Sequence, residues 1–252
     1  MSNYQRNPTM VGCILAVLVI GAVAVGFLAY YGTSYFNWNF NPATTDFSFE
    51  AEVGATNETV ALDVNVAAGS ISIVFVDNES LLYEIDMLVQ NTTLDTEGVP
   101  TVSFIGNTIG VEYPSLGMNI TLGSGVNYTI NILTQSGSVS VVFGAGAHIG
   151  DLTASVTSGS ISIVMVDDTV LLGSPTFDLQ TTTGGISIVA DLPSGVGGSI
   201  ECATSLGSVS ITAAGWTEIT SNHYETTDYD TASQTLTIVA QTGLGGVSAV
   251  LT

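Results

Sequence analysis

The sequence predicts an all-β protein of short stacked strands, preceded by one transmembrane helix. A Gly-Ser-Ile-Ser-Ile phrase recurs along most of the chain, and apolar residues alternate with Ser and Thr inside each copy. Only residues 10–31 form a long apolar run. We therefore expect a β-solenoid, similar to a β-helix, and keep an antiparallel β-sandwich with a hairpin at each T-x-G as the alternative.

The repeated phrase consists of Gly, a small residue, Val or Ile, Ser, and Ile or Val. Between the four copies in the middle of the chain the spacing is 22, 25 and 23 residues. A nearly constant period of this length is typical of solenoids and other repeat arrays. Full copies begin at Gly69, Gly137, Gly159, Gly184, Gly207 and Gly245, and a looser copy, GSIECA, begins at Gly198.

Alternation within each copy places the Ile and Val side chains on one strand face and the Ser side chains on the other. A second short strand precedes each glycine, so the unit is strand, T-x-G corner, strand. Glycine at the corner permits a bend or a positive φ without a Cβ clash. We expect the following side chains to be buried in stacked rows: Ile71, Ile73, Ile161, Ile163, Ile186, Ile188, Val209 and Ile211.

A longer repeat appears when the chain is shifted by 90 residues, which lays LDVNVAAGSISIVFVD over LTASVTSGSISIVMVD. This indicates an internal duplication, about 60–143 and 150–252, with a less regular insert near residues 94–127. The last repeat strand, residues 245–252, has no polar cap after it. We expect this edge to be available for self-association, unless an earlier segment such as the insert near 94–127 folds over it.

The N-terminal part predicts a membrane anchor. Residues 10–30 carry no charged side chain and are about as long as a bilayer-spanning helix requires. Arg6 precedes them, which favours a cytoplasmic tail over 1–9, a helix over 10–31, an aromatic linker over 32–50 and an extracellular domain over 51–252. A cleaved signal peptide is the alternative, although this apolar run is longer than usual for one.

Charge excludes several functions. The chain has 22 acidic residues and a single basic one, Arg6, for a net charge of −21. Nothing beyond the N-terminus could neutralise phosphate, so nucleic-acid binding and P-loop chemistry are excluded. We expect no enzyme activity, because the isolated His148 and His223 and the turn carboxylates form no recognisable catalytic motif. We expect Cys202 to be a buried strand residue.

Oxygen-rich turns suggest a calcium site. Asp77 and Glu79 follow one copy of the phrase, and Asp167 and Asp168 follow its repeat partner. Ca²⁺ takes six to eight oxygen ligands from such loops. Five Asn-x-Ser/Thr sequons are candidate glycosylation sites in an extracellular domain: Asn57, Asn78, Asn91, Asn119 and Asn127.

The repeated phrase resembles the "toast-rack" β-solenoid adhesin domains of membrane-anchored bacterial and archaeal proteins. The stretches that carry the resemblance are TQSGSVSVV, TSGSISIVMV, TTGGISIV, TSLGSVSIT and TGLGGVSAV, within residues 60–252. Members of that family usually have Asp or Lys at the outward positions, where this chain has Ser. The resemblance implies a structural fold and carries no catalytic residues.

Together these features predict a membrane-anchored structural or adhesin-like protein of the cell surface. Its expected partners are the lipid bilayer, further copies of itself, and a surface glycan or protein. A membrane-anchored sensor or regulator is the alternative, and an envelope glycan hydrolase is a third hypothesis.

Overall fold

The computed structural model describes residues 43–54, 58–144 and 146–252, and the predicted helix over 10–31 lies outside them. The described residues form strands and the turns between them, with one short helix, so the all-β prediction is confirmed. The elements are β1 (Thr44–Glu52), β2 (Thr59–Phe75), β3 (Leu81–Gln90), α2 (Asn91–Glu97), β4 (Val102–Ile105), β5 (Thr108–Ser115), β6 (Gly117–Leu122), β7 (Asn127–Phe143), β8 (His148–Met165), β9 (Val170–Leu171), β10 (Thr176–Thr183), β11 (Ile186–Ala190), β12 (Val196–Leu206), β13 (Val209–Ala213), β14 (Trp216–Thr220), β15 (His223–Thr226), β16 (Gln234–Leu244) and β17 (Val247–Leu251).

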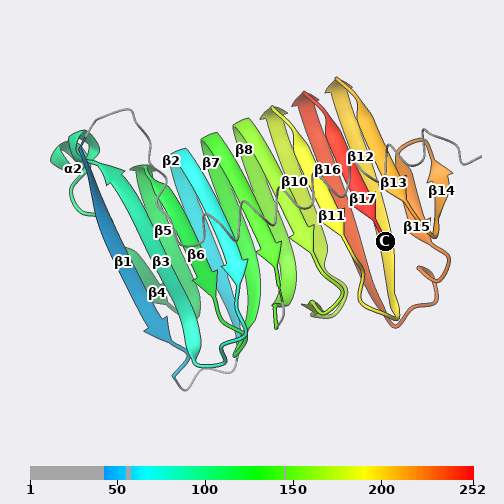
Figure 1. Ribbon diagram of the computed structural model, residues 1–252, viewed down its shortest axis with the longest axis horizontal. Helices are drawn as coiled ribbons and strands as arrows, with labels where there is room; N and C mark the ends of the chain where they lie inside the picture. The colour runs from blue at the N-terminus through cyan, green and yellow to red at the C-terminus, as the bar shows by residue number, and fades with distance from the viewer. Residues whose placement is uncertain (1–42, 55–57, 145) are drawn as a thin grey trace, which may run out of the picture. The chain divides into compact units, whose positions relative to one another are not determined.

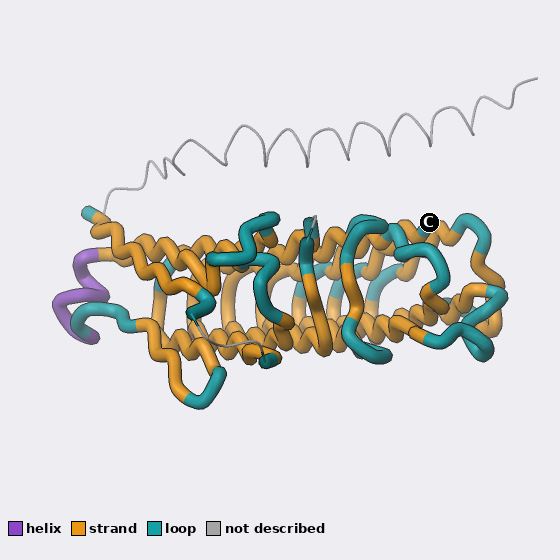
Figure 2. Tube along the Cα trace, turned by 90° about the horizontal axis from the view of Figure 1, so that it is seen from below, coloured by secondary structure: helices purple, strands orange, loops and turns teal. Residues whose placement is uncertain are grey.

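The strands form two layers joined along one side by corners. Strands β2, β7 and β8 each bend at a glycine, so that their first part lies in one layer and their second part in the other (Figures 1 and 2). The pairs β5/β6, β10/β11, β12/β13 and β16/β17 divide between the layers in the same way. We call the layer that precedes the corners the first layer and the one that follows them the second layer.

Neighbouring copies of the phrase pair in parallel and in register. Ser72 lies beside Ser140, Ser140 beside Ser162, and Ser162 beside Ser187. Each copy passes through the first layer and then, in the opposite direction, through the second layer. The next copy can therefore begin beside the start of the previous one and pair with it in parallel, without a long crossover connection. The alternative of antiparallel hairpins at each T-x-G is therefore wrong.

Glycine is required at each corner. The six full copies of the phrase place their glycine at φ between 140° and 155°, where residues with a Cβ are strained. A Cβ added to Gly159 would also fall on the carbonyl oxygen of Gly137, and one added to Gly137 would fall on that of Gly69. The same clash repeats through the stack, so the corner glycines allow adjacent backbones to approach to ladder distance.

The core lies between the two layers. In β2, the residues buried before Gly69 are even-numbered, and those buried after it are odd-numbered, so the corner resets the alternation. The Ile residues predicted to be buried in the copies at Gly69, Gly159 and Gly184 are at most 2% exposed. Phe143 lies between Phe75 and Phe177, with ring centroids 5.5 and 5.4 Å apart.

The order of strands in the stack differs from their order in the sequence. β17 lies between β11 and β13, so the C-terminal strand has neighbours on both sides and is no free edge, contrary to our expectation. The last strand of the second layer is β13, where Val209 and Ile211 are only half-buried because no further strand covers them among the described residues. The predicted burial of these two side chains is therefore only partly correct.

Two other parts of the sequence pattern have a different structure from the repeats. Gly198 is not a corner; it lies within β12, under the indole of Trp216. The insert near 94–127 contains α2, β4 and a further bent pair, β5/β6, in which Leu116 and Gly117 stand at the corner. Within the described residues, no helix has the length and apolar character needed to cross a membrane.

We predict that Gly159→Ala will destabilise the fold far more than Gly195→Ala. Both glycines have a positive φ, but an added Cβ at Gly195 meets nothing within 4 Å. The control should therefore lose only about 1 kcal/mol to backbone strain, whereas Gly159→Ala must separate two strands and should lose more than about 4 kcal/mol. Chemical unfolding of both variants measures the difference, and equal losses would contradict the proposed role of the corner.

Candidate functional site

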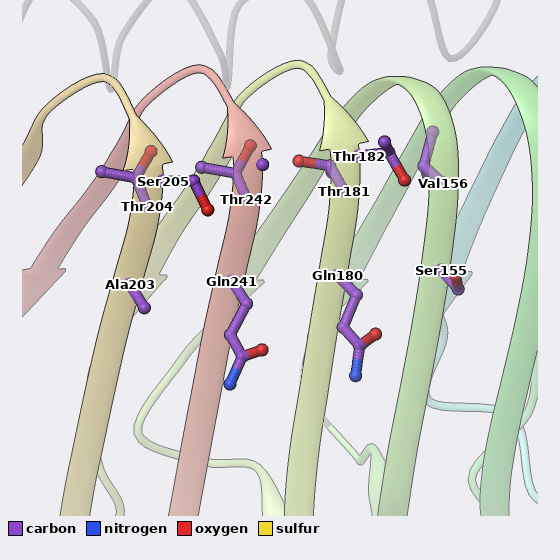
Figure 3. A pocket seen from close by; sticks show the side chains of 11 residues that line it. Ser155, Val156, Gln180, Thr181, Thr182, Ala203, Thr204, Ser205, Gln241 and Thr242 are labelled. Carbon is purple, nitrogen blue, oxygen red and sulfur yellow. The ribbon is translucent and has the colours of Figure 1, made fainter.

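A shallow groove of about 350 Å³ lies on the outer face of the first layer, beside the corners (Figure 3). Four neighbouring strands, β8, β10, β16 and β12, supply its lining. Hydroxyl and amide groups predominate in this lining, and no charged or aromatic side chain contributes to it. The lining residues are Ser155, Val156, Gln180, Thr181, Thr182, Ala203, Thr204, Ser205, Gln241, Thr242 and Gly243.

Strand register brings the groove residues together. Gln180 pairs directly with Ser155 on one side and with Gln241 on the other, and Gln241 pairs with Ala203. Strands lie about 4.8 Å apart, so this row of four spans about 14 Å. The small residues Ala203 and Gly243 stand beside the two long amide side chains, and this difference in size helps to hollow the surface.

A carboxylate orients one of the two amides. The Nε2 of Gln180 donates to both oxygens of Asp178, at 3.0 and 3.1 Å. Because a carboxylate only accepts hydrogen bonds, the amide nitrogen must face Asp178, and the amide oxygen is left as an acceptor. Gln180 and Gln241 are both exposed, so their amides can contact a ligand in the groove.

Threonines on the inner side of the groove connect one corner to the next. The Oγ1 of Thr204 donates to the carbonyl of Gly245 at 3.0 Å, and that of Thr242 donates to the carbonyl of Gly184 at 3.0 Å. Thr181 stands at the same position of the neighbouring strand, where its buried Oγ1 makes no hydrogen bond to a described residue. These contacts fix the backbone beneath the groove.

A second polar cluster contains His223, Glu225 and Ser199. The Nε2 of His223 lies 3.1 Å from Glu225 Oε1 and 3.2 Å from Ser199 Oγ. A catalytic triad needs the nucleophile and the acid on opposite ring nitrogens, whereas both contacts here fall on the same nitrogen. The cluster therefore lacks the geometry of a Ser-His-acid relay and serves to attach β15 to β12.

The four carboxylates of the suggested calcium site lie in two exposed turns. Asp77 and Glu79 follow β2, and Asp167 and Asp168 follow β8. β7 runs between these two strands, so the turns are about 10 Å apart in the stack. Across residues 43–252, gaps excepted, no three His, Cys, Asp or Glu residues are grouped to hold a metal ion. Calcium binding stays a prediction.

The sequons in the described residues all lie outside the groove. Asn78 is exposed in the turn after β2, and Asn119 is exposed on the outer face of β6. Asn91 begins α2 and Asn127 begins β7, and both are half-exposed. Asn57 falls outside the described residues. Glycans at these positions would therefore leave the groove, which residues 155–243 form, uncovered.

Cys202 is buried in β12, as predicted. Burial raises the pKa of its thiol to about 12, with a smaller contribution from Glu201. The thiol is therefore protonated at neutral pH, which makes it a poor nucleophile and a poor metal ligand.

The sequence alone did not identify the groove, although one signal was available. Gln180 and Gln241 each stand four residues before a corner glycine, Gly184 and Gly245, so equivalent outward positions could have been inferred. Their pairing could not, because β16 lies between β10 and β12 in the stack and not after β13.

Comparison with known proteins relates the chain to solved structures only. No protein-family model matches it, and no curated protein matches its sequence. A "putative cell adhesion protein" from Clostridium sporogenes ATCC 15579 is 14% identical, with a TM-score of 0.67 over 83% of this chain and 100% of that one. A "putative adhesin" from Bacteroides fragilis NCTC 9343 is 10% identical, with a TM-score of 0.31 over 83% of this chain and 98% of that one. The first likeness shows that this chain shares the fold of the Clostridium protein.

Proposed function

We propose that this chain is a membrane-anchored, adhesin-like protein of the cell surface. Its β-solenoid would bind an uncharged, hydroxyl-rich ligand, such as a neutral glycan, in the groove of the first layer. Such a protein binds and does not catalyse. The observation that carries the proposal is the groove itself, an uncharged row of hydroxyl and amide groups on a chain of net charge −21.

The chemistry of the groove fits sugar hydroxyls. Amide side chains both donate and accept hydrogen bonds, as does each hydroxyl of a sugar. The groove is open and lined by several strands of a rigid stack, so a ligand would lose little affinity to reordering of the protein. Anionic ligands are disfavoured, because the whole chain carries 22 acidic residues and only one basic residue.

The proposed location rests on the sequence. The charge-free residues 10–30 follow Arg6, which favours a cytoplasmic N-terminus and an extracellular C-terminal domain. The sequons in that domain agree with this orientation. The resemblance of the repeats to toast-rack adhesin domains and the fold shared with the Clostridium protein also support a surface role.

We predict that protease added to intact cells will remove a tag fused after Thr252. The tag would lie outside the membrane together with the stacked strands. A tag that is cleaved only after lysis would contradict the orientation.

We predict that the full chain in detergent micelles will bind neutral glycans on an array and will not bind sulfated or sialylated ones. Gln180→Ala and Gln241→Ala should each weaken binding about fivefold, because each removes about 1 kcal/mol of hydrogen bonding. Gln90→Ala is the matched control, since Gln90 is exposed on β3, away from the groove. The proposal fails if no neutral glycan binds, or if the two groove variants bind as well as the control.

A further inference from the structure

The outer face of the second layer carries two continuous rows of identical side chains. One row contains six serines and the other five valines, each side chain beside its equivalent on the next strand. The serine row is Ser72, Ser140, Ser162, Ser187, Ser248 and Ser210, and the valine row is Val74, Val142, Val164, Val189 and Val250. We call this surface the Ser/Val face.

The valines of this face point away from the core. Their sequence neighbours Ile73, Ile163 and Ile188 are at most 1% exposed, whereas Val189 is 44% exposed and the other four valines are half-buried. Single exposed apolar residues are common on protein surfaces, but a contiguous apolar stripe often marks an interaction site. Five valines at about 4.8 Å intervals form such a stripe, about 20 Å long.

Charge distribution separates the Ser/Val face from the rest of its layer. The two rows contain no charged residue across β2, β7, β8, β11, β17 and β13. In the valine row, the neighbour of Val74 is Thr121, and beyond it come Glu84 and Glu50, which pair directly. Acidic side chains border this layer at the β1/β3 end and in the turns that follow β2, β8 and β11, where Asp77, Asp167 and Asp191 are exposed. The Ser/Val face between these borders carries no charge.

We propose that the Ser/Val face is the contact surface between two copies of this chain, which pack layer against layer in an isologous dimer. The occupant is a second copy because this neutral surface lets two chains of charge −21 approach with least repulsion. The inference is independent of the glycan proposal, which concerns the opposite layer.

The rows determine which two-fold axis suits the dimer. If the two-fold axis is parallel to the strands, a residue and its equivalent in the second copy lie at the same height along the strand direction. The valine row of one copy then packs on the valine row of the other, and the serine row on the serine row. The same axis reverses the order of strands, which places the Glu50 and Glu84 ends of the two copies apart. With Val164 at the middle of its row, the Val164 side chains of both copies meet near the axis.

The available area predicts a weak dimer. Six strands at about 4.8 Å and six residues at about 3.3 Å give a footprint of about 29 by 20 Å. This is about 600 Å² per copy, somewhat less than the roughly 800 Å² of a standard interface. We therefore expect dimerisation that depends on concentration and increases with salt, because salt screens the repulsion between the copies.

Sedimentation of the full chain in detergent micelles tests the proposal. Val164→Glu would place two carboxylates together at the axis and should reduce the dimer fraction at least fivefold. Leu133→Glu is the matched control, because Leu133 is 47% exposed on the outer face of the first layer. Thermal unfolding of both variants checks that they fold equally well.

Cross-linking tests the arrangement of the two copies. In a Cys13→Ser background, Val164→Cys should be joined to its equivalent in a second copy by a bis-maleimide of about 10 Å, the spacing of packed sheets. Leu133→Cys should not be joined, and the buried Cys202 leaves the background unreactive. The proposal is overturned if the wild type is monomeric at every salt concentration. It is equally overturned if Val164→Glu dimerises like Leu133→Glu, which would assign association to another part of the chain.

Discussion

The close approach of one corner backbone to the next is the constraint on which this structure depends. At each corner glycine, an added Cβ would overlap the carbonyl oxygen of the neighbouring corner. At Gly245 this oxygen belongs to Gly184, and at Gly207 it belongs to Gly245. A side chain there would force adjacent strands apart just where the ladder must bend. Glycine removes that obstacle, and its φ near 145° lets the chain turn from one layer into the other.

Aligned corners have a consequence for the surface. Once the glycines are in register, every position at a fixed distance from a glycine lies beside its equivalent on the next strand. A residue type that recurs at one position of the repeat therefore forms a row across the strands. Ile and Val form rows in the core, Ser and Val form rows on the outer face of the second layer, and Gln180 and Gln241 lie side by side on the outer face of the first layer. The groove of the first layer and the Ser/Val face arise from the same geometry, and they differ only in which side chains occupy the rows.

Much of this architecture could be predicted from the sequence, because it depends on local pattern. The glycine phrase, the alternation in Ser70–Ile73 and the exclusion of helix from the repeats gave parallel stacking, the inward Ile residues and the outward Ser ladder. The order of strands could not be predicted, because all copies offer nearly equivalent edges. Nothing local indicates that β17 lies between β11 and β13. The segment between β13 and β16 packs Trp216 and Tyr224 against the core, a tertiary contact that the repeat pattern does not contain. For that reason the expected free edge at 245–252 was wrong, and the pairing of Gln180 with Gln241 was missed.

The stacking of the corners is tested most directly by finding which serines of the second layer are neighbours. Ser187 lies beside Ser248, and Ser248 lies beside Ser210, so Ser187 and Ser210 are about 10 Å apart. Paired cysteines should form a disulfide under mild oxidation in Ser187→Cys/Ser248→Cys, whose Cα atoms are within bridging range, and not in Ser187→Cys/Ser210→Cys. The reverse result would mean that the copies stack in sequence order, and it would contradict the ladder of corners and the groove built on it.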